Sequence, residues 1–117
     1  MESSLSKPYS LKKLSGFVGD DPKQVVEMIS LFIETIPPEL EFLKDYAANQ
    51  DMDHVAMVAH RIKPSLDVFD LQYAMQIIRT IELFCKDATK HKEVPALVRD
   101  LRQNLLAALE VMKTELS

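Results

Sequence analysis

The side chains best suited to chemistry at neutral pH are the histidines, since imidazole changes its charge between about pH 5 and 8. There are three of them, at His54, His60 and His91. His54 and His60 are six residues apart, which puts them on different faces of a helix, so they do not form the i, i+4 pair that holds a metal ion. We expect His54, in the first turn of a helix, and His91, in a loop, to be solvated surface residues.

His60 lies on a stretch, residues 52–69, whose apolar residues recur at helical spacing. A helix turns by about 100° per residue. By this rule the apolar residues project to one side of the helix and form a stripe of Val55, Val58, Ala59, Ile62, Leu66 and Phe69. His60 points roughly 150° away from the centre of that stripe. The spacing therefore excludes a core histidine, and it leaves open whether His60 is an ordinary surface residue or a functional one.

The neighbours of His60 on the outer face favour a functional role. Lys63 is one turn further along, where its ammonium can reach a group attached to the imidazole ring, although a solvated lysine fits the same spacing. Pro64 carries no long side chain to cover the ring, but it lacks the N–H that would bond the His60 carbonyl. Ala56 and Met57 add small or apolar surface. This grouping suits the docking of a protein that brings a phosphate.

Helices must hold these residues, because the chain contains no glycine after Gly19 and tight turns depend on glycine. The apolar spacing predicts a short helix over 8–17 and long helices over 22–48, 52–69, 71–88 and 94–115. Pro37 and Pro38 predict a kink in the second of these, or its division into two. Asp21, Asp51 or Asp53, and Asp70 are the expected N-caps. We therefore predict an all-α fold, an antiparallel four-helix bundle with a short extra N-terminal helix.

The chain of 117 residues is expected to be one domain, residues 1–117, with residues 1–7 loose. A net charge of −4 without a basic block argues against nucleic-acid binding. No apolar run is long enough to span a membrane, and no glycine-rich loop indicates a nucleotide site. The single cysteine, Cys85, cannot form an intrachain disulfide, and a cytoplasmic location is the default expectation.

The segment AHRIKPSLDVFDL, residues 59–71, resembles the signature of histidine-containing phosphotransfer (HPt) domains. That pattern has a histidine, a lysine three residues later, and then a small residue. The preceding segment FIETIPPELEFLKDYAANQDMDHVAMVAH also has the mid-helix proline and the small apolar approach to the histidine that are typical of the family. The resemblance covers residues 8–115, and its specific part is residues 32–82.

The resemblance implies that the chain is a phosphorelay intermediate and not an enzyme. His60 would accept a phosphoryl group from a receiver-domain aspartate and pass it to another receiver, while Lys63 would help to hold the phosphate. The partners implied are response-regulator receiver domains and a hybrid sensor histidine kinase. No metal ion or other cofactor of its own is implied, since the receiver supplies Mg²⁺, and we expect a monomer. The docking surface around His60 is expected to include Ala56, Met57, Arg61, Pro64 and Asp67.

Two positions depart from the family pattern, which usually has glycine where this chain has Pro64 and again where it has Asp70. Asp67, one turn beyond Lys63, could pair with Lys63 or repel an incoming phosphate. An alternative function is a helical adaptor that binds receivers or other signalling proteins without carrying phosphate. A small-molecule enzyme is disfavoured, because no acid or base other than Asp67 is expected near His60.

Overall fold

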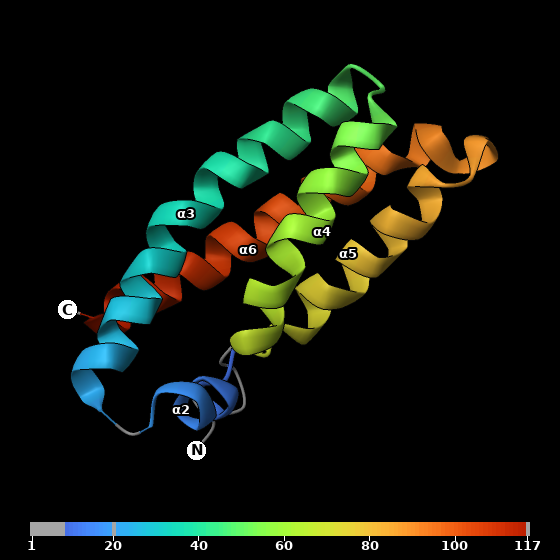
Figure 1. The fold of residues 1–117 in the computed structure, drawn as a ribbon. Helices are drawn as coiled ribbons and strands as arrows, with labels where there is room; N and C mark the ends of the chain where they lie inside the picture. The colour runs from blue at the N-terminus through green and yellow to red at the C-terminus, as the bar shows by residue number, and fades with distance from the viewer. Residues whose placement is uncertain (1–8, 20, 117) are drawn as a thin grey trace.

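The computed structural model describes residues 9–19 and 21–116, so the segment expected to be loose, residues 1–7, lies outside it. The chain forms helices throughout these residues (Figure 1), with no strand among them. They are α2 (Lys12–Val18), α3 (Pro22–Ala48), α4 (Met52–Val68), α5 (Gln72–Cys85), the 3₁₀ helix η1 (Ala88–Glu93) and α6 (Val94–Leu116). The predicted all-α fold is confirmed.

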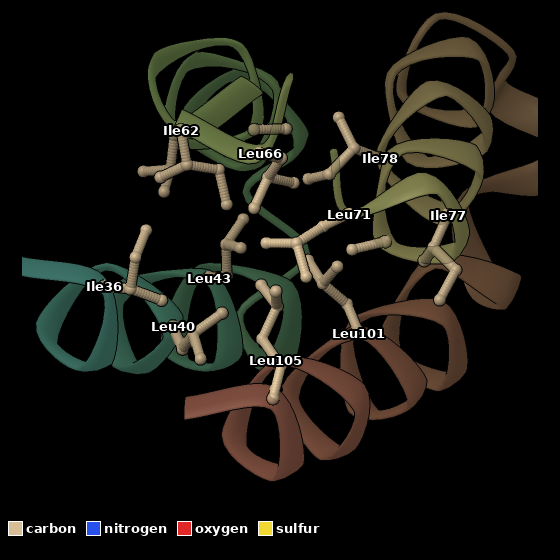
Figure 2. Close-up of a cluster of buried hydrophobic side chains, with 14 of the residues drawn as sticks. Ile36, Leu40, Leu43, Ile62, Leu66, Leu71, Ile77, Ile78, Leu101 and Leu105 are labelled. Atoms are coloured by element: carbon tan, nitrogen blue, oxygen red, sulfur yellow. The ribbon is translucent and has the colours of Figure 1, made fainter. Parts of the chain in front are cut away.

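Four of the helices form an antiparallel bundle in which α3 packs against α4 and α6, and α5 packs against the same two helices. The core fills the space between them, and Figure 2 shows side chains from all four helices converging there. It contains Ile36, Leu40 and Leu43 from α3, Ile62 and Leu66 from α4, Ile77 and Ile78 from α5, Leu71 just before α5, and Leu101 and Leu105 from α6. Full burial of one such side chain stabilises the fold by about 1.5–3 kcal/mol.

The short helix α2 packs against α3 and lies near the end of α4. The backbone N–H of Ser10 donates to the carbonyl of Phe69, at 2.8 Å. Leu14 is buried, and the ring of Phe32 meets that of Phe69 with centroids 4.6 Å apart. This arrangement is the predicted extra N-terminal helix, which begins at Lys12 and ends at Val18.

Local signals explain where the helices begin. The side chain of Asp21 accepts a hydrogen bond from the backbone N–H of Lys23, and Pro22 occupies the first helical position. Asp51 accepts from the N–H of His54 at 3.2 Å and caps α4. Pro37 and Pro38 do not divide α3, which runs as one helix from Pro22 to Ala48. Residues on both sides of the two prolines, such as Ile29 and Leu43, are buried along one face of it.

Two helices end at residues in the left-handed region, Gln50 at φ 56° and Asp70 at φ 53°. After α4, the N–H of Asp70 bonds the carbonyl of Asp67 and the N–H of Leu71 bonds that of Leu66, both at 3.0 Å. These are the two bonds of a Schellman motif, which usually has glycine in this place. The prediction that Asp70 caps α5 is wrong, because its backbone closes α4 and no side chain caps α5.

The region after α5 also differs from expectation. The helix ends at Cys85, three residues before the predicted end, and the expected polar link forms the 3₁₀ helix η1. His91 is not fully solvated, since its Nε2 lies 2.8 Å from the Cys85 carbonyl, which α5 leaves without a helical partner. His54 is half-exposed, but it stacks on Tyr46 at 4.7 Å and its Nδ1 lies 2.7 Å from Asp51.

Candidate functional site

His60 stands at the middle of α4 with its side chain 78% exposed. The helix continues unbroken through Pro64 to Val68, although Pro64 supplies no N–H to the His60 carbonyl. The stripe behind His60 holds α4 in place, since Val58, Ala59 and Ile62 are all buried. The imidazole is therefore fixed to a rigid element while its ring projects into solvent.

The carboxylate of Glu82 on α5 connects the two residues on which the site was predicted. Its Oε2 lies 3.5 Å from His60 Nδ1, and its Oε1 accepts a 2.7 Å hydrogen bond from Lys63 Nζ. Because Nδ1 faces Glu82, the nitrogen on the opposite side of the ring, Nε2, is turned away from that carboxylate. Glu82 is a site residue that the sequence pattern around His60 does not reveal.

Lys63 is more enclosed than His60, with its side chain 32% exposed. Its ammonium carries three N–H donors, and the bond to Glu82 uses one of them. Two donors remain for a group that approaches from the side of His60. The structure thus places Lys63 beside His60, as expected, but already paired with a carboxylate.

The residues predicted to dock a partner differ in their exposure and in the contacts they make. Met57 and Pro64 are exposed, and Ala56 is half-buried. Arg61 turns towards α3, where it donates two hydrogen bonds of 2.6 Å to Glu39, and this carboxylate raises the pKa of the Arg61 guanidinium. Met57 and Pro64 therefore offer apolar surface next to the His60 imidazole without covering it. Arg61 belongs to an ion pair with the neighbouring helix α3.

Asp67 does not pair with Lys63, which was one of the two possibilities raised by the sequence. It accepts a 2.8 Å hydrogen bond from Lys13 Nζ on α2, a bond that raises the pKa of Lys13. Both side chains are about half-exposed, so solvent screens the pair and it contributes little to the stability of the fold. The contact ties α2 to the face of α4 that carries His60.

Two shallow depressions meet at His60, and both lie between α4 and α5. The first extends past Pro64 and Asp67 to Met75, and the second extends past Glu82 to Leu83 and Lys86. His60, Lys63 and Arg79 line both of them. The residues expected to dock a partner all lie within 52–69, but the hollows beside His60 are walled by α4 and α5.

The other reactive side chain, Cys85, is partly buried against the core. Burial, followed by the charge of Glu82, raises the pKa of its thiol. The thiolate is disfavoured in this setting, and a thiol is a poor nucleophile. Across residues 9–19 and 21–116, no three histidine, cysteine or carboxylate side chains gather as a metal site would require.

The described helices include none with the length and apolar composition needed to cross a membrane. Comparison with known families assigns the chain to a class. Residues 27–114 match the family model of the Hpt domain. The match spans more than half of the chain, so this protein belongs to the Hpt domain family. Hpt domains take part in phosphorelays as phosphoryl carriers and interact with receiver domains. No curated protein and no solved structure matches the chain.

Proposed function

We propose that His60 carries the phosphoryl group of a phosphorelay, accepting it from the aspartyl phosphate of one receiver domain and passing it to the aspartate of another. One observation supports this proposal above the rest. The His60 ring is 78% exposed at the middle of a rigid helix, and its Nδ1 faces a carboxylate while Nε2 faces away. An adaptor that only binds would not need a histidine presented in this way.

The chemistry assigned to each atom follows from that geometry. In the neutral ring, the proton sits on Nδ1 beside Glu82 Oε2, and the lone pair is on Nε2. The Nε2–P bond forms as the bond between phosphorus and the receiver's aspartate oxygen breaks, and the aspartate leaves with the electron pair. The ring becomes positively charged, and the Glu82 carboxylate stabilises that charge. Transfer to the second receiver reverses these steps.

Lys63 is proposed to bind the phosphoryl oxygens with the N–H donors that Glu82 leaves available. The receiver would supply Mg²⁺, which neutralises the transferring group. Docking is proposed to use the apolar surface of Ala56, Met57 and Pro64, with Arg61 and Asp67 at the rim. The upstream donor is proposed to be a receiver of a hybrid sensor histidine kinase in the cytoplasm, and the carrier is proposed to act as a monomer.

The test measures transfer from purified receiver domains of the same cell, phosphorylated beforehand with acetyl phosphate. Wild-type chain should gain a phosphate that is stable in base and labile in acid, as expected for an N–P bond. His60→Gln should gain none. His54→Gln is the matched control, because it removes a half-exposed histidine from the same helix and should leave labelling unchanged.

Equal labelling of His60→Gln would refute the proposal. If no receiver of the panel transfers phosphate to the wild-type chain, and binding to a receiver survives His60→Gln, the adaptor function is supported instead. Binding is measured by titration calorimetry with the same receivers, so both results come from one set of proteins.

A further inference from the structure

Arg79 is a cation beside His60 to which no role has yet been given. It is exposed on α5, about one helical turn before Glu82. Both depressions at His60 are lined by the same three residues, His60, Lys63 and Arg79. A group attached to Nε2 that occupies either hollow therefore lies among these three side chains.

The charges next to His60 do not favour an anion without a further cation. The ammonium of Lys63 is 2.7 Å from the carboxylate of Glu82, so the two charges largely cancel. At the far rim of the first depression, Lys13 and Asp67 cancel in the same way at 2.8 Å. A phosphoryl group carries a charge of about −1.5 to −2 at neutral pH, and its binding requires positive charge that these pairs do not provide.

Arg79 supplies that charge. Within the part of the chain that the structure describes, its guanidinium makes no hydrogen bond and no ion pair, so its donors are available. A guanidinium can bind two phosphate oxygens through parallel N–H···O bonds, which an ammonium cannot do. Lys86 is also near His60, but it lines only the second depression.

We infer that Arg79 binds the phosphoryl group carried by His60, an inference that rests on the proposed function. Lys63 and Arg79 would then hold the group from α4 and α5 respectively. This division explains how the chain can keep Lys63 paired with Glu82 and still bind an anion. It also makes α5 part of the phosphate site, whereas the sequence pattern placed that site on the helix of His60 alone.

The test uses the whole chain phosphorylated with phosphoramidate, a small donor that transfers its phosphoryl group to imidazole and releases ammonia. No receiver is needed. The phosphorus NMR resonance of phosphorylated His60 is identified by its absence from His60→Gln. Its chemical shift is then followed over about pH 5.5 to 8.5, a range that includes the second ionisation of a phosphoryl group.

A bound guanidinium favours the dianion of the phosphoryl group, so Arg79→Gln should raise the midpoint of this titration by about 0.5 unit. Arg79→Lys should restore part of the shift, because it returns the charge without the paired donors. Arg99→Gln is the matched control. Arg99 is exposed on α6, where it lines a groove between α6 and α3, and its replacement removes the same single positive charge as Arg79→Gln. An Arg79→Gln midpoint equal to that of wild type would overturn the inference.

Failure of this inference is distinguishable from failure of the proposed function. Phosphoramidate labels an exposed imidazole directly, so the midpoint can be measured even if no receiver transfers phosphate to His60. If Arg79→Gln slows transfer from a receiver but leaves the midpoint unchanged, Arg79 contacts the receiver and not the phosphoryl group. That result overturns the inference while the role of His60 stands.

Discussion

Replacing Asp70 with glycine should stabilise the fold, because Asp70 closes α4 in the left-handed region at φ 53°. An L-residue pays about 1–2 kcal/mol for this conformation, with aspartate near the lower end. Glycine avoids that cost but loses about 0.5–1 kcal/mol of additional chain entropy on folding. The side chain contributes little in return, since its contacts with Gln72 are 3.4 and 3.5 Å long and exposed. The net gain expected for Asp70→Gly is about 0.5 kcal/mol.

Removal of the Asp70 charge should not obscure this effect. The residue follows the C-terminus of α4, where a negative charge is unfavourable, and precedes the N-terminus of α5, where it is favourable. Asp70→Ala provides the control, because it removes the same charge and keeps the Cβ atom that glycine lacks. We expect Asp70→Ala to be less stable than wild type, and less stable than Asp70→Gly by about 1 kcal/mol.

The assay is urea unfolding followed by far-ultraviolet circular dichroism, with stability compared at a constant m-value. In thermal unfolding, the same gain corresponds to an increase in Tm of about 2 °C for a chain of this size. Gln50→Gly at the end of α3 should behave alike, since Gln50 has φ 56° in an equivalent motif. The reasoning fails if glycine at position 70 is no more stabilising than alanine.

Two further predictions concern the core and the docking surface. Leu66→Ala should lower the free energy of unfolding by about 3–4 kcal/mol, because Leu66 is fully buried between the helices (Figure 2). Leu83 is 65% exposed, so Leu83→Ala should change the free energy of unfolding by less than about 0.5 kcal/mol. Comparable losses from the two substitutions would contradict the packing described. Pro64→Trp should slow transfer from a receiver roughly tenfold by placing an indole over the approach to His60. Leu106→Trp, which adds the same group to α6, should transfer at the wild-type rate, and equal slowing of the two would place docking elsewhere.

The helices could be predicted closely where local chemistry determines their ends. The bounds of α3, Pro22–Ala48, are those predicted, because Asp21 and Pro22 form a start signal within adjacent residues. The end of α5 was predicted three residues late, since the apolar spacing continues while the chain turns into η1. Asp70 was assigned to the wrong helix because a left-handed aspartate and an N-cap aspartate look alike in a sequence.

The candidate site could be predicted only on the helix that carries His60. Periodicity within α4 is enough to place His60 outside and Lys63 beside it. Glu82 and Arg79 were missed because their proximity to His60 depends on how α5 is aligned along α4, which the turn at Asp70 sets. The spacing of the charged residues on α5 did contain a signal, since Arg79, Glu82 and Lys86 recur at three and four and so share a face. Nothing in that spacing says which neighbouring helix the face adjoins.

The central position of His60 has a consequence for how partners distinguish this surface. Eight helical residues lie on either side of it in α4, which places each end of the helix about 12 Å away. A protein interface of ordinary size covers about 800 Å² on each partner, equivalent to a disc of roughly 16 Å radius. A footprint centred on His60 therefore reaches the Lys13–Asp67 pair, because Asp67 projects from the same face of α4 as His60. Selection for the attachment of α2 and selection for a particular partner thus act on the same side chains.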